Sequence, residues 1–155
     1  GLECPILPEH TQAQLREFTP AAGTSVRNPV DTITVFEPPK LEHTLRIIGE
    51  AENIHAIAFH TTLGWGAARR LMAGLGGDPG MYMDMVVDRL VSGRDASGTP
   101  VAVILRPPLD VEWTERAVAF QEKCWRAGLP VFPTVPRAAG AIAKVIRWAQ
   151  GREER

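Results

Sequence analysis

SVRNPVDTITVFEPPK (residues 25–40) runs from a predicted strand into a predicted helix. Pro29 excludes Asn28 from the α region, and the β-branched residues within 31–35 favour an extended strand. The tandem prolines at 38–39 prevent a helix before their own positions, where a missing N–H does no harm. We therefore expect a strand at residues 31–35 and a helix that begins at one of these two prolines.

The predicted helix has an apolar face. Leu41, Leu45 and Ile48 recur at helical spacing, and the pattern continues to about Ala51. The helix follows a predicted strand, and the free N–H groups and dipole of its first turn would point at any ligand bound there. The helix start is therefore a candidate anion site.

Strands and helices alternate along the rest of the chain. Apolar runs predict strands at 54–60, 101–106 and 130–133, and helical periodicity predicts helices at 8–18, 39–51, 81–92, 110–127 and 137–150. The nearly continuous run at 54–60 is typical of an interior strand that is covered on both faces. This alternation predicts an α/β fold in which helices flank a parallel sheet.

Glycines mark the segments that we expect to lie outside these elements. Residues 61–80 are predicted to form a mobile crossover, and residues 93–98 a polar turn. Within the crossover, GLGGDPG at 74–80 lacks the Lys-Ser/Thr of a phosphate-binding P-loop. We expect a flexible turn there.

Composition limits the classes of protein that the chain can belong to. Its 155 residues are 45% hydrophobic and 23% charged with a formal net charge of -1, which predicts one soluble domain over residues 1–150 and a solvated tail at 151–155. The sequence has no cluster of lysines and arginines, so we do not expect nucleic-acid binding. No apolar run could cross a bilayer and the first residues do not resemble a signal peptide, so we expect a cytoplasmic protein. Cys4, Cys124 and four dispersed histidines offer no metal-ligand spacing, so we expect no metal site and reduced thiols.

Ligands of parallel α/β sheets bind at the carboxyl ends of the strands. His60, followed by Thr61 and Thr62, ends one predicted strand and is the best-placed histidine for a crevice there. A structural or solvent-facing histidine is the favoured alternative. No residue of the chain is predicted to be catalytic.

GLECPILPEHTQAQLREFTPAAGTSVRNPVDTI (residues 1–33) resembles a C-terminal domain of NDP-forming acyl-CoA synthetases, the ADP-forming acetate-CoA ligase family, which are relatives of succinyl-CoA synthetase. GLPVFPTVPRAAGAIAKV (residues 128–145) is similar to a later stretch of the same domain. The matching segments keep their order over nearly the whole chain, and VRNPVD is the most specific of them.

The resemblance implies a three-layer, flavodoxin-like (Rossmann-like) fold and a place in a larger assembly. That assembly converts an acid, CoA and ATP to acyl-CoA, ADP and phosphate through a phosphohistidine carried by a neighbouring domain. CoA, ATP and Mg would belong to the parent assembly, with no cofactor in this chain. We therefore expect other domains or subunits as partners and no activity in the isolated chain, and the sequence leaves a homo-oligomer open.

The resemblance also implies that the helix after NPVD presents its N-terminus to the phosphohistidine loop. The docking turn would consist of Val35, Phe36 and Glu37, with the amides of Lys40 and Leu41 at the helix start. Small residues usually occupy this turn in the family, whereas bulk and a carboxylate oppose an anion here. A degenerate binding module that kept the fold without the phosphate chemistry is therefore the alternative.

Two further expectations concern the organisation of the domain. Asn28, Pro29 and Asp31 would either hold the loop in the geometry required at a domain interface or cap a local turn. Domains of the family begin with a central strand and a helix that precede the GLEL-like segment, and this sequence starts after them. We expect the first strand-helix unit to be missing because the chain is a fragment of a longer polypeptide; another chain or an altered topology are the alternatives.

Overall fold

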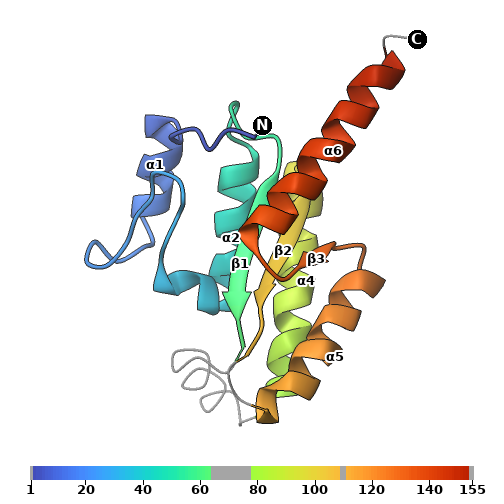
Figure 1. Cartoon of the computed structure of the whole chain (residues 1–155). Coiled ribbons are helices and arrows are strands. Elements are labelled where there is room, and N and C mark those ends of the chain that lie inside the picture. Colours follow the sequence, from blue (N-terminus) through green and yellow to red (C-terminus); the bar gives the residue numbers. More distant parts are fainter. Residues whose placement is uncertain (1, 64–77, 109–110, 154–155) are drawn as a thin grey trace.

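The computed structural model describes residues 2–63, 78–108 and 111–153 of the chain. The elements follow one another as α1 (Glu9–Arg16), η1 (Ile33–Phe36), α2 (Pro38–Gly49), β1 (Ile57–Thr62), α4 (Pro79–Ser97), β2 (Val101–Arg106), α5 (Glu112–Arg126), β3 (Val131–Phe132) and α6 (Val135–Glu153) (Figure 1). Most of the predicted helices are confirmed in type and position. The predicted start of α5 at residue 110 lies outside the described residues.

The described strands form a parallel sheet in the order β1-β2-β3. Ile57 of β1 aligns with Val101 of β2, and Val103 of β2 aligns with Val131 of β3. The strands predicted at 101–106 and 130–133 are confirmed, as is their parallel direction. The sheet is flanked by helices, so the α/β, flavodoxin-like fold class is also confirmed.

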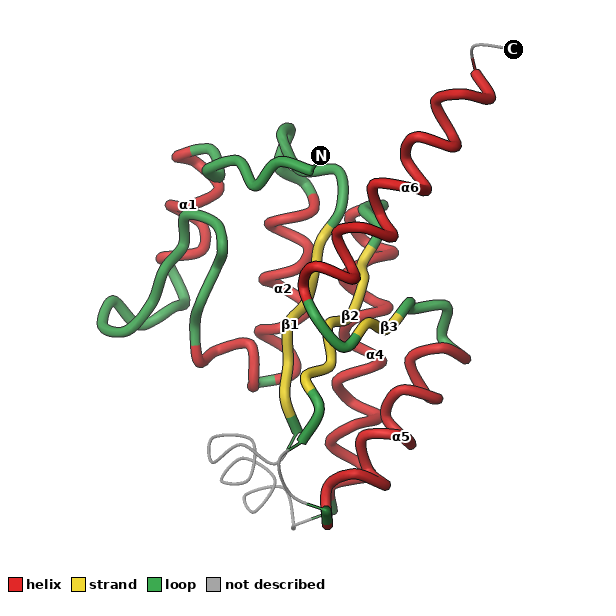
Figure 2. Tube along the Cα trace, viewed as in Figure 1, coloured by secondary structure: helices red, strands yellow, loops and turns green. Residues whose placement is uncertain are grey.

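Strand β2 is the centre of the core. Val101, Val103 and Leu105 belong to the large apolar cluster that α2, α4 and α5 build on one face of the sheet. Ala102 and Ile104 are buried on the opposite face, because side chains alternate along a strand. Helix α6 contacts β2 and β3 on that side (Figure 2). The sheet is thus the middle of three layers.

Strand β1 lies at the edge of this sheet, so the expectation of an interior strand is wrong. Ile57 is buried and Phe59 packs against the large cluster, but Ala58 and His60 are exposed. The apolar run correctly predicted one buried face. The other face of β1 is not covered by a described helix, which the apolar run could not predict.

The predicted strand at 31–35 is also wrong, because Ile33–Phe36 form the short 3-10 helix η1. The Thr32 hydroxyl accepts a hydrogen bond from the Thr34 amide at 3.3 Å and caps this turn. Only an isolated antiparallel bridge between Ser25 and Asp31 remains of the extended geometry. Local bonding by threonine thus replaces strand pairing.

Helix α4 extends beyond its predicted end, and the polar turn expected at 93–98 is helical as far as Ser97. Gly98 ends the helix in the left-handed conformation, with φ 70°. Gly93 is inside the helix and packs against α2, where an added Cβ would lie 2.7 Å from the Leu45 Cβ. Of the predicted crossover at 61–80, residues 61–62 belong to β1, residues 79–80 belong to α4, and residues 64–77 lie outside the described parts.

A smaller apolar cluster forms between α1, the following loop and the far side of α2. It consists of Leu7, Leu15, Val26, Ile47 and Ala51. Two side-chain amides attach the N-terminal segment to it: Asn28 Nδ2 donates to the Pro5 carbonyl at 2.8 Å, and Asn53 Nδ2 donates to the Ile6 carbonyl at 2.9 Å. The described residues therefore form two apolar cores that meet at α2.

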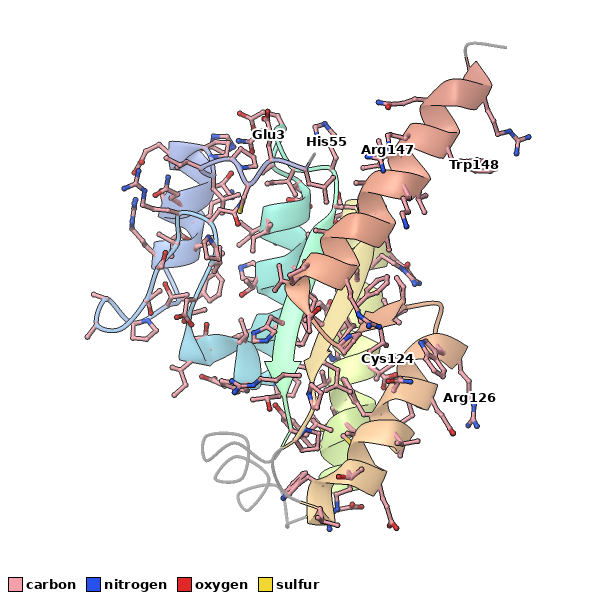
Figure 3. The ribbon with its side chains drawn as sticks, in the orientation of Figure 1. Glu3, His55, Cys124, Arg126, Arg147 and Trp148 are labelled. Carbon is pink, nitrogen blue, oxygen red and sulfur yellow. The ribbon has the colours of Figure 1, made fainter. Side chains whose placement is uncertain are left out.

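Helix α6 continues through Glu153, so residues 151–153 of the expected tail are helical. Figure 3 shows Arg147 and Trp148 on the part of α6 that projects beyond the sheet. The Arg152 guanidinium lies over the Trp148 ring, 4.9 Å from its centroid. In the described part of the chain, no helix is long and apolar enough to span a membrane.

Candidate functional site

The candidate site is the start of α2, where Glu37 is the N-cap and Pro38 the first helical residue. A helix normally leaves its first four N–H groups without an intrahelical partner. Here the Glu37 amide donates to the Thr34 carbonyl at 3.0 Å, and the Lys40 amide donates to the Glu37 carbonyl at 2.9 Å. The two prolines between them have no N–H. Every amide of this first turn is therefore either used or absent.

The Leu41 amide, the last of the predicted docking donors, is also bound. It donates to the Glu37 carbonyl at 3.0 Å, in the normal pattern of an α-helix. A phosphate at this position would have to replace these bonds, because no N–H group of residues 37–41 points outward without a partner. The dipole of α2 remains, but its usual hydrogen-bond donors do not.

The charged side chains at the helix start neutralise each other. Lys40 Nζ lies 2.9 Å from one carboxylate oxygen of Glu37 and 3.1 Å from the other. Both side chains are about half exposed, so the pair contributes little to stability. The Lys40 charge is thus already matched by a carboxylate on the positive end of the dipole.

Helix α4 contacts the backbone of the docking turn through a hydrogen bond. Tyr82, whose side chain is buried, donates its hydroxyl to the Phe36 carbonyl at 3.5 Å. Burial raises the pKa of Tyr82 to about 12, so this hydroxyl remains a donor above the pH at which an exposed tyrosine ionises. Tyr82 was not among the residues that the sequence predicts for this site. The signal was its position four residues before Val86, on the apolar line of the predicted helix.

A very small cavity separates the docking turn from the end of β1. It is lined by Phe36, Thr61, Thr62, Leu63, Tyr82, Met83, Val86 and Phe120. Its volume of about 10 Å³ is no more than one water molecule needs. Val35, which is partly buried, packs against the large core and does not line it. The described residues thus fill the expected crevice with side chains.

His60 does not join this arrangement. Thr61 and Thr62 line the cavity, whereas His60 does not and is exposed on β1. The structure therefore brings Phe36, Thr61 and Thr62 together and leaves His60 apart from them. Among the described residues, none forms a hydrogen bond or ion pair with the His60 side chain that would give it a reacting partner.

The loop before the site is tied to distant parts of the chain. Asn28 has φ 125° and a cis peptide bond to Pro29, and its side chain bonds the Pro5 carbonyl. The Ser25 and Asp31 backbones exchange two hydrogen bonds of 2.8 Å, and the Ser25 hydroxyl donates to the Pro29 carbonyl at 3.1 Å. Asn28 thus fastens the loop to the N-terminal segment, and the Asp31 side chain is exposed.

The described residues contain no group of three His, Cys, Asp or Glu side chains that could hold a metal ion. Cys4 is exposed and Cys124 is buried, and burial raises the pKa of the Cys124 thiol to about 12. In Figure 3 Cys124 lies on the inner side of α5. The Cys124 thiol is a core group and not a reactive one.

No protein-family model matches the chain, and a search of curated proteins finds no match. Among solved structures, the crystal structure of PH0766 from Pyrococcus horikoshii OT3 is similar, with a TM-score of 0.62 and 19% sequence identity. The match covers 85% of this chain and 26% of that chain. The chain therefore spans about a quarter of the length of that protein, and the likeness establishes the fold alone.

Proposed function

We propose that this chain is a binding module related to the C-terminal domain of NDP-forming acyl-CoA synthetases, one that retains the fold without receiving a phosphoryl group. The hydrogen bonds made by the backbone amides at the start of α2 carry this proposal. Glu37, Lys40 and Leu41 use their N–H groups within the turn, and the prolines have none.

The energetics favour the same conclusion. An anion at a helix N-terminus gains about 0.3–1 kcal/mol at an exposed position, and much of that gain depends on free N–H groups. The Glu37 carboxylate already lies near this end of the dipole, paired with Lys40. Bringing a phosphoryl group close to it would add like-charge repulsion.

The partners of such a module would be other domains or subunits of an acyl-CoA synthetase assembly in the cytoplasm. The resemblance of residues 25–31 to the SVRNPVD pattern and the flavodoxin-like fold support this choice. CoA, ATP and Mg would bind elsewhere in that assembly. The isolated chain would then have no ligase activity, because catalysis requires these groups to be held against the reacting phosphate.

The second candidate is the catalytic role, in which α2 presents its N-terminus to a phosphohistidine loop. Two observations favour it. The docking turn shares a cavity with Thr61 and Thr62, at the carboxyl end of β1 where ligands of such sheets bind. The Glu37–Lys40 pair is also half exposed, so it can open without unfolding the helix.

Titration of ¹⁵N-labelled protein with inorganic phosphate distinguishes the two candidates. We expect no saturable amide shifts in residues 35–42. The Glu37→Gln variant separates the effect of the carboxylate charge from that of free N–H donors, because it removes the carboxylate but frees no backbone amide. We expect no saturable amide shifts in this variant either. Glu50→Gln, at the opposite end of α2, is the matched control. Saturable shifts confined to residues 35–42 of the unaltered protein would refute the binding-module proposal.

A further inference from the structure

We draw no further inference here: the strongest candidate, the exposed surface of the C-terminal half of α6 that carries Val145, Ile146 and Trp148, is an unpartnered helix face, and nothing in the structure shows what covers it.

Discussion

Replacing Gly93 by alanine tests a close approach between α4 and α2 in the core. Gly93 lies inside α4, where an added Cβ would be 2.7 Å from the Leu45 Cβ, 3.1 Å from the Leu45 Cδ1 and 3.4 Å from the Glu42 carbonyl oxygen. Leu45 is buried in the large cluster. Its Cβ is attached directly to the backbone of α2 and cannot rotate away. The two helices would have to separate.

The magnitude follows from this geometry. Reaching an ordinary carbon–carbon contact of about 3.5 Å requires the helices to move apart by about 0.8 Å, which loosens the contacts along their crossing. Overpacking of this kind costs about 1–3 kcal/mol, and a backbone-fixed neighbour favours the upper end. Alanine recovers about 1 kcal/mol of helix propensity. The free energy of unfolding should therefore fall by about 2 kcal/mol.

The chain provides a matched control in Gly140 of α6, where an added Cβ meets nothing within 4 Å. Gly140→Ala gains the same propensity without the clash and should stabilise the protein by about 0.5–1 kcal/mol. Urea unfolding of both variants measures the contrast. Thermal unfolding of Gly93→Ala should show a midpoint about 4–8 °C lower. If Gly93→Ala is as stable as the unaltered protein, α2 and α4 are not close-packed at this glycine and the reasoning fails.

Two further substitutions test buried polar groups. Because burial raises the pKa of Tyr82 to about 12, the unfolded chain loses this proton first, from about pH 10 upward, and stability declines between these two values. In urea unfolding, the free energy of unfolding of Tyr82→Phe should decline less over this pH range than that of the unaltered protein. The same pH dependence in both proteins would show that Tyr82 does not cause the decline. Thr99→Val leaves the Gly49 carbonyl without the 2.7 Å hydrogen bond that the Thr99 hydroxyl donates, and should lower the free energy of unfolding by about 1–3 kcal/mol. Thr99→Ser keeps the hydroxyl and should lose clearly less; equal losses would assign the effect to the methyl group.

The sequence predicted the elements whose cause is local. The start of α2 was predictable from its two prolines, and β2 from an apolar run that both faces of the sheet bury. Segment 31–35 failed because strand propensity needs a partner strand, and the Thr32 and Thr34 hydroxyls offered the backbone an alternative.

Other features depend on contacts that no single segment encodes. Gly93 was interpreted as a turn residue, whereas its lack of a side chain serves the crossing of α4 with α2. The exposed face of β1 depends on what lies beside Ala58 and His60, which the apolar run does not record. At the candidate site, Glu37 and the prolines were recognised as unfavourable to an anion. The carbonyl that binds the Lys40 and Leu41 amides became evident only from the folded turn.

The two apolar clusters differ in the free energy at which they open. The smaller one joins α1 and the N-terminal segment to the rest mainly through Ile47 and Ala51, and it contains no residue of the described sheet. Regions with few buried contacts open at a lower free energy than the global transition. The N-terminal part can therefore detach from α2 while β2 and its helices remain folded. Breaking the hydrogen bonds of the Asn28 and Asn53 side-chain amides then starts that opening.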